Sequence, residues 1–195
     1  MTTIWRSSFA LLTAALVACG GPQGPKFRGT DITGADFGKA LSLTGHDGKP
    51  RTLADFRGKL VVLSFGYTHC PDVCPTTLAD TAAALKQLGA AAARVQVLFV
   101  TVDPERDTPA LLAQYVPAFD PSFLGLTGDA AAIEKAAKEF KIFYEKRPGA
   151  APGAYTVDHS AQSYVLDREG RLRLIERNDR LAQDLAEDLR ALLDS

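Results

Sequence analysis

The sequence predicts an α/β protein in which a central sheet is flanked by helices. Two short apolar runs without alternation, at 59–65 and 95–102, are typical of strands buried on both faces. After each run, apolar residues recur at helical spacing, so strands and helices alternate as they do in parallel sheets with right-handed crossovers. With 195 residues, 46% of them hydrophobic, the chain is long enough to form one such domain.

The first residues have the pattern of an export signal. Arg6 precedes an uncharged stretch, 7–18, which ends in small residues and is too short to span a bilayer comfortably. Leu16-Val17-Ala18-Cys19 resembles a bacterial lipobox, whose cysteine is lipidated and becomes the mature N-terminus. We therefore expect a signal peptide at 1–18 and a lipid anchor on Cys19, which make the protein a membrane-anchored lipoprotein on the periplasmic, extracytoplasmic side. The alternative is an ordinary signal peptide with an incidental cysteine.

Residues 19–36 are rich in Gly, Pro and Thr and show no periodicity, which predicts a flexible tether. The folded domain is expected at 37–195. It begins with a predicted hairpin, because apolar residues at 41–43 and 51–53 flank His46-Asp47-Gly48, and Asp-Gly readily supplies positive φ. His46 is interpreted as a solvated loop residue of this turn and not as a ligand.

The later elements follow from local periodicity and from turn residues. They are a helix after Pro75 that ends at Gly89, a helix capped by Asp107 or Thr108, a strand at 123–126, a helix at 129–140, a strand at 141–145, a Pro/Gly loop at 147–155, a hairpin of 163–166 and 172–176, and a final amphipathic helix marked by leucines from 181 to 192. Together they predict a thioredoxin-like layout: a central mixed sheet flanked by helices, with an N-terminal hairpin.

Cys70 and Cys74 follow the first buried strand directly and lie only four positions apart. Such a pair cannot staple distant parts of a fold, so chemistry at the pair is the better interpretation. If a helix starts here, the two residues lie roughly 6 Å apart along its axis, which permits either a disulfide or convergence on one soft metal ion. The helix N-terminus is expected to lower the thiol pKa and favour both reactions.

Two thiolates alone form an incomplete metal site, which directs attention to histidine. His69 adjoins Cys70 but need not face the same ion, whereas His159 follows the Pro/Gly loop, from which it can reach the sheet edge that carries the first helix. Two thiolates and an imidazole suit copper, as Cu(I), Cu(II) or both, and zinc is the alternative. Asp72 could support the site from behind its ligands, but a carboxylate is a poor ligand for Cu(I), so capping the helix is its favoured role. Asp103 could support the site in the same way or simply turn the chain.

Charge excludes one class of partner. The formal net charge is −1, with 22 basic and 23 acidic residues, so the chain lacks the broad basic surface that neutralises phosphates. Nucleic acid is not expected as a partner.

Three segments together resemble the Sco/SenC family of copper-binding, thioredoxin-like proteins: 65–75 (FGYTHCPDVCP), 102–109 (VDPERDTP) and 158–160 (DHS). They occur in the family's order, and the resemblance spans about 37 to 193. It implies that Cys70, Cys74 and His159 bind one copper ion. It also implies that the protein either delivers copper to the binuclear copper site in subunit II of cytochrome c oxidase, or keeps the cysteines of that site reduced. Another periplasmic copper chaperone or a thiol reductase is a further partner to expect.

The competing interpretation is a periplasmic thiol–disulfide oxidoreductase or redox-homeostasis protein, with Cys70 and Cys74 as a redox pair. The three-residue spacer argues against it, since thioredoxin-like reductases normally carry two residues between their cysteines. Whether the protein acts as an enzyme is therefore left open by the sequence. A purely structural local disulfide is the least favoured reading, because so short a loop adds little stability.

Overall fold

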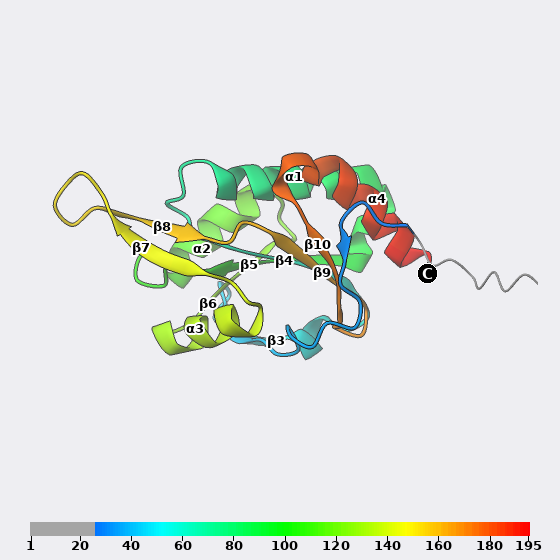
Figure 1. Cartoon of the computed structure of the whole chain (residues 1–195), viewed down its shortest axis with the longest axis horizontal. Helices are drawn as coiled ribbons and strands as arrows, with labels where there is room; N and C mark the ends of the chain where they lie inside the picture. The colour runs from blue at the N-terminus through cyan, green and yellow to red at the C-terminus, as the bar shows by residue number, and fades with distance from the viewer. Residues whose placement is uncertain (1–25) are drawn as a thin grey trace, which may run out of the picture.

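The computed structural model describes residues 26–195 and shows an eight-stranded mixed sheet with helices on both faces (Figure 1). The expected signal peptide and Cys19 lie outside these residues. The strand order is β1-β10-β9-β4-β5-β6-β2-β3, and β7 pairs only with β8. The strands are β1 (Thr30–Asp31), β2 (Ser42–Gly45), β3 (Pro50–Thr52), β4 (Leu60–Gly66), β5 (Val95–Thr101), β6 (Leu124–Thr127), β7 (Tyr144–Pro148), β8 (Tyr155–His159), β9 (Ser163–Leu166) and β10 (Leu172–Glu176). The α-helices are α1 (Val73–Leu88), α2 (Pro109–Tyr115), α3 (Ala130–Glu139) and α4 (Leu181–Leu193).

The centre of the sheet is formed by the two apolar runs that the sequence singles out. Every residue of β4 is buried, and β4 pairs in parallel with β5 and antiparallel with β9. Val62, for example, lies opposite Val97 on one side and Val165 on the other. A strand with neighbours on both edges and helices on both faces needs apolar residues at successive positions, which is why β4 shows no alternation.

Helices α1, α2 and α4 cover one face of the sheet, and α3 covers the other (Figure 1). Helix α1 packs against α4, and Thr108 caps α2 by accepting a hydrogen bond from the backbone N–H of Leu111. Asp129 caps α3 in the same way. The mixed sheet flanked by helices and the N-terminal β2–β3 hairpin are therefore confirmed. No helix within residues 26–195 is both long and apolar enough to cross a bilayer.

The folded part begins earlier than residue 37, where the sequence places the end of the tether. Strand β1 pairs antiparallel with β10. The backbone N–H groups of Arg28 and Gly29 donate to the carboxylate of Asp188 at 2.8 and 2.7 Å. A two-residue strand is too short to show periodicity, and its partner lies more than 140 residues further along the chain. Local patterns therefore could not reveal this contact.

The region from 141 to 155 also differs from the prediction. The strand expected at 141–145 starts at Tyr144, because Lys141 adopts a left-handed turn with φ of 53°. Only the middle of the loop expected at 147–155, residues 149–154, lies outside strands. Its two ends belong to a hairpin, in which β7 and β8 pair from Tyr144↔His159 to Pro148↔Tyr155. The Pro and Gly residues at 148–153 suggested a loop, but those beyond Pro148 form only its turn. This hairpin projects beyond the main sheet (Figure 1).

Candidate metal centre

The two cysteines lie where the chain leaves β4 and enters α1, beyond the carboxyl end of β4. Cys70 is half-buried in the loop, and Cys74 lies in the first helical turn with 3% of its surface exposed. The backbone N–H of Cys74 donates to the sulfur of Cys70 at 3.4 Å. Both are free thiols. An N–H group from the helix start therefore points at Cys70, and it favours negative charge on that sulfur.

Gly66 permits Cys74 to lie directly on the sheet. A Cβ atom at this position would be 2.6 Å from Cys74 Sγ and 2.8 Å from the ring of Phe99. Both distances are shorter than van der Waals contact, so any side chain at Gly66 would push the helix start away from the sheet.

Burial raises the pKa of the Cys74 thiol above its ordinary value, and the nearby Cys70 adds to the shift. The expectation that the helix N-terminus lowers the pKa is therefore wrong for Cys74. The apolar surroundings of its sulfur outweigh the helix dipole. A positively charged ion would reverse this balance by replacing the proton, as metal ions do at thiol ligands.

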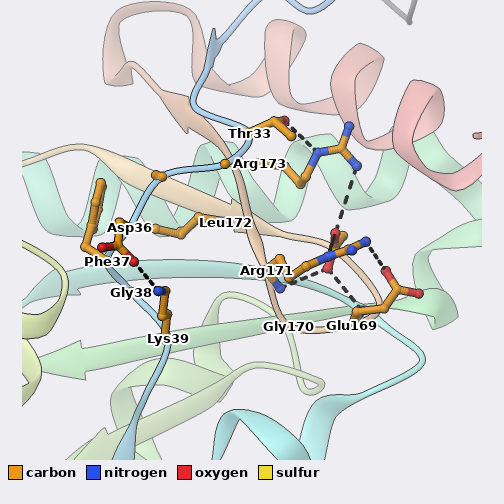
Figure 2. Close-up of a pocket in the computed structure, with 13 residues that line it drawn as sticks. Thr33, Asp36, Phe37, Gly38, Lys39, Glu169, Gly170, Arg171, Leu172 and Arg173 are labelled. Atoms are coloured by element: carbon orange, nitrogen blue, oxygen red, sulfur yellow. Dashed lines mark hydrogen bonds and ion pairs between the residues drawn. The ribbon is translucent and has the colours of Figure 1, made fainter.

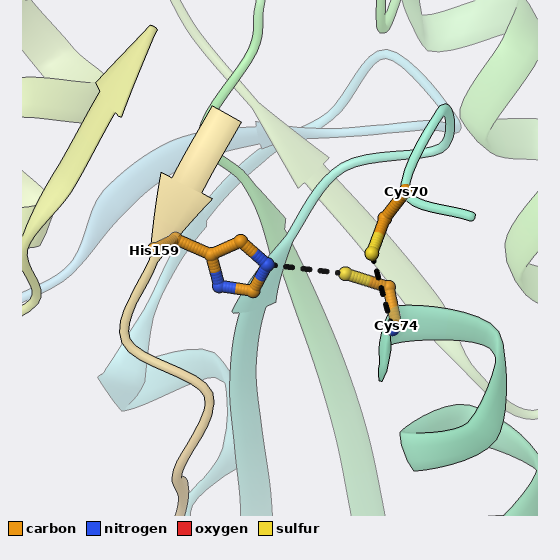
Figure 3. Close-up of side chains that lie close together, drawn as sticks. All are labelled: Cys70, Cys74 and His159. Carbon is orange, nitrogen blue, oxygen red and sulfur yellow. Dashed lines mark hydrogen bonds between the residues drawn. The ribbon is translucent and has the colours of Figure 1, made fainter. Parts of the chain in front are cut away.

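His159 completes the cluster from a part of the chain 85 positions away. It is the last residue of β8, and its Nε2 lies 3.3 Å from Cys74 Sγ (Figure 3). Its Nδ1 lies 2.9 Å from the carbonyl oxygen of Ser160. Because a carbonyl only accepts, Nδ1 carries the hydrogen and the Nε2 lone pair faces the sulfur, as in metal-ligating histidines. The ring also packs edge-on against Tyr67, with centroids 5.9 Å apart.

The donor atoms of Cys70, Cys74 and His159 all lie within 4.8 Å of one another. Ligands bound to one ion at roughly 2.0–2.3 Å lie about 3.5–4.5 Å apart, so the three atoms suit a single ion with little movement. A cavity of about 10 Å³ borders Cys74 and His159 but not Cys70, so it lies beside the cluster and not between its three ligand atoms.

Two buried carboxylates hold the loop that follows β5 against this site. Asp107 accepts hydrogen bonds from the backbone N–H and the hydroxyl of Thr68, at 3.0 and 2.6 Å, and from the hydroxyl of Thr101 at 2.7 Å. Asp107 therefore fixes the turn that precedes Cys70. Asp103 is also fully buried and binds Arg106 and the hydroxyl of Tyr155. Of the two roles considered for Asp103, its contacts favour support of the site.

The other residues considered from the sequence lie outside the cluster. His69 is exposed and lies 3.0 Å from the hydroxyl of Thr68. His46 is half-buried and accepts a hydrogen bond from the backbone N–H of Gly125, so it joins the hairpin to β6 and is not simply solvated. Asp72 occupies the N-cap position of α1, but its exposed side chain makes no capping hydrogen bond. The capping role expected for Asp72 is therefore wrong.

A larger cavity, about 720 Å³, lies between residues 33–39 and the β9–β10 hairpin (Figure 2). Its charged side chains are paired with one another. Arg173 donates to the hydroxyl of Thr33 at 2.9 Å, and Arg171 donates to Asp167 at 2.9 Å. The cavity contains no cysteine or histidine, so we place the chemistry of this protein at the cysteine–histidine cluster.

Known proteins match most of the chain. A family model described as SCO1/SenC matches residues 29–194. The chain is 42% identical over 152 residues to the mitochondrial protein SCO2 homolog of Bos taurus, and this match covers 77% of the chain but only 57% of the bovine protein. The chain thus spans somewhat more than half the length of that relative.

Solved structures are similar over nearly their whole length. Apo Sco1 from Thermus thermophilus is 43% identical, with a TM-score of 0.77 over 88% of this chain and 99% of that one. ScoI from Bradyrhizobium japonicum, solved with copper bound, is 40% identical, with a TM-score of 0.74 over 80% of this chain and 99% of that one. These similarities confirm the thioredoxin-like fold class.

Proposed function

The chain belongs to the SCO1/SenC family, and on that premise we propose that it is a copper chaperone that holds one copper ion through Cys70, Cys74 and His159. The observation that carries this proposal is the convergence of two sulfurs and one imidazole nitrogen within 4.8 Å. Thiolates select Cu(I), and imidazole is accepted by both oxidation states. Copper is the cargo of such a protein, and the chain's own residues select it and release it.

The acceptor that we propose is the binuclear copper site in subunit II of cytochrome c oxidase, the role implied by the three sequence motifs. Cys70 and His159 are each half-buried, so a partner can approach these two ligands from solvent while Cys74 stays covered. A ligand exchange that starts at Cys70 or His159 would pass the ion on without unfolding the helix start.

A competition titration with a chromophoric Cu(I) chelator tests the site. We expect the Cys70→Ala, Cys74→Ala and His159→Ala variants each to bind Cu(I) at least about 100-fold more weakly. Removing a residue that only hydrogen-bonds to a metal ligand already weakens binding by about 10- to 100-fold, and removing the ligand itself should cost at least as much. His69→Ala is the matched control, because His69 adjoins Cys70 but lies outside the cluster, and it should bind like the wild type. Unchanged affinity in Cys74→Ala would refute the copper site.

Thiol–disulfide exchange is the second candidate, and the position of Cys70 favours it. Cys70 is the more accessible of the two cysteines, and its sulfur accepts a hydrogen bond from the backbone N–H of Cys74 at the start of the helix. In such a reaction the Cys70 thiolate attacks a partner disulfide, and one partner sulfur leaves as a thiolate. Cys74 then gives up its proton and attacks Cys70, which releases the partner as a dithiol and leaves a Cys70–Cys74 disulfide. Reduction of a protein disulfide at the rate of dedicated reductases would favour this function over copper delivery.

We also propose that the protein is exported and anchored through lipid on Cys19, outside the described residues. The support is the sequence of residues 6–19. Labelling of cells with a radioactive fatty acid should mark the wild-type protein and leave the Cys19→Ser variant unlabelled. Absence of label on the wild type would contradict the anchor without affecting the copper site.

A further inference from the structure

The β7–β8 hairpin, which brings His159 to the cysteines, has few means of holding its position. It forms no ladder with the eight-stranded sheet, and most of its residues are exposed. An isolated two-stranded hairpin is marginally stable at best in water. The place of His159 therefore depends on a small number of side-chain contacts between the hairpin and the main domain.

Arg106 makes the most extensive of these contacts. Its guanidinium lies over the ring of Tyr155, 3.7 Å from the centroid, and its Nη1 donates to the carbonyl oxygen of Tyr155 at 3.0 Å. The Nε of Arg106 donates to Asp103, which in turn accepts a hydrogen bond from the Tyr155 hydroxyl at 2.8 Å. These three residues form a closed ring of contacts that joins the end of β5 to the start of β8. We call Asp103, Arg106 and Tyr155 the clamp.

The clamp and His159 are connected through the geometry of a strand. Tyr155, Val157 and His159 alternate along β8 and share one face, so fixing Tyr155 sets the direction of a strand that ends at His159 roughly 13 Å away. Val157 is buried between them, and its backbone N–H donates to the hydroxyl of Tyr67 at 3.2 Å. These contacts form a line along β8 that runs from the clamp to the metal ligand. On the neighbouring strand β7, the exposed side chain of Lys146 adds an ion pair with Glu105 at 2.7 Å.

Tyr67 joins this line to the cysteine loop. Its ring lies 5.5 Å from the guanidinium of Arg106 and packs against the edge of His159. It also precedes the turn at Thr68 that leads to Cys70. A displacement of Arg106 would therefore remove support from the hairpin and from the aromatic ring on which His159 rests.

We propose that Arg106 is a positioning residue that holds the β7–β8 hairpin against the domain and thereby keeps His159 beside Cys74. The consequence for copper rests on the function proposed above. Arginine suits this role because its planar group can stack on an aromatic ring while its fork donates to two acceptors, whereas lysine cannot do both.

Amide hydrogen exchange of the metal-free protein tests the clamp without copper. In Arg106→Ala we expect the amides of 144–147 and 155–159 to exchange at least tenfold faster than in the wild type, while those of β4 and β5 keep their rates. Arg106→Lys should fall between the two. The matched control is Arg147→Ala, which removes the same charge from two exposed ion pairs within the hairpin, with Glu145 and Asp158, and should accelerate exchange much less than Arg106→Ala. Unchanged exchange in Arg106→Ala would overturn the proposal whatever the copper affinity.

A double-mutant cycle then tests whether Arg106 acts through His159. We expect Arg106→Ala to weaken Cu(I) binding about tenfold in the wild-type background, and less than twofold in the His159→Ala background. Electron paramagnetic resonance of the Cu(II) form should show reduced nitrogen coordination in Arg106→Ala. An equal loss of affinity in both backgrounds would mean that Arg106 stabilises the fold in general, which would overturn the positioning role. If the wild type binds no copper but exchange accelerates as expected, the clamp stands and the proposed function falls.

Discussion

The cysteine half and the histidine half of the metal centre are built in opposite ways. Cys70 and Cys74 come from one short segment between a fully buried strand and a helix, where Asp107 and Gly66 fix their positions. His159 comes from a projecting hairpin outside the main sheet. The core of the domain therefore preforms one half of the site, whereas a few side chains hold the other half. Substitutions in the cysteine half should therefore change folding stability and ligand geometry together, whereas substitutions that loosen the hairpin should change the position of His159 with little effect on folding stability.

The largest effect is expected from Gly66→Ala, which attacks the preformed half. The new methyl group meets Cys74 and Phe99 in the centre of the fold. We expect the free energy of unfolding in urea to fall by about 3 kcal/mol and the Cu(I) affinity to fall with it. Ser64→Ala, two residues earlier on the same face of β4, is the control and should change both much less. A Gly66→Ala variant with the unfolding free energy and the Cu(I) affinity of the wild type would contradict the idea that the core of the domain preforms the cysteine half of the site.

Asp107→Asn should have the next largest effect on the same half. The amide group would place donor hydrogens against the N–H and hydroxyl groups that Asp107 now accepts from. We expect a loss of about 2–3 kcal/mol in unfolding free energy. Asp129→Asn makes the same chemical change at the N-cap of α3, where Asn caps as well as Asp, and should be nearly neutral. Equal effects of the two substitutions would show that the Asp107 contacts do not fix the cysteine turn.

Glu176→Gln should change stability without touching either half. Burial raises the pKa of Glu176 from 4.5 to about 8, and the nearby carboxylate of Asp188 adds to the shift. The folded state then holds a proton that the unfolded state has lost, so the stability of the wild type should fall as pH rises between about 4.5 and 8. Within this window the slope is about 1.4 kcal/mol per pH unit.

Urea denaturation at pH 6.5 and pH 8 checks this expectation. The side chain of the Glu176→Gln variant cannot ionise, so the unfolding free energy of this variant should fall less between the two pH values than that of the wild type. Its Cu(I) affinity at pH 7 should stay that of the wild type. Parallel pH profiles of the two proteins would show that Glu176 is ionised in the folded state at neutral pH.

The smallest effect is expected from Asp72→Ala. An N-cap residue that bonds to the helix typically contributes about 1 kcal/mol, but the side chain of Asp72 makes no such bond. We expect a change below ~0.5 kcal/mol in unfolding free energy and no change in copper affinity. A loss as large as that of a bonded cap, measured by thermal or urea unfolding, would mean that Asp72 does cap α1 in solution.

Sequence reasoning was most accurate where an element leaves a regular local pattern. β4, α1 and α4 show continuous apolar runs or helical spacing, and each formed close to its predicted bounds, although α1 begins at Val73 and not after Pro75. The position of Cys70 and Cys74 after a buried strand followed from the same patterns. The fold class needed no more than the order of these elements.

The rest depends on contacts that local patterns do not encode. Its position made His159 a candidate but did not separate a ligand from a structural histidine; the family resemblance did. In the structure its Nε2 lies 3.3 Å from Cys74 Sγ. The attachment of the N-terminal segment rests on Asp188, far away in the sequence. The raised pKa of Cys74 follows from tertiary burial, which outweighs the helix start that the sequence reveals.

The separate two-stranded sheet also makes the protein convenient to engineer. Residues 149–154, the exposed turn of the β7–β8 hairpin, contribute nothing to the ladder of the eight-stranded sheet. Exposed loop tips of this kind are the sites where insertions and length changes are best tolerated. A fluorescent label attached there would report the motion of the β7–β8 hairpin, which carries His159, while leaving the eight-stranded sheet unaltered.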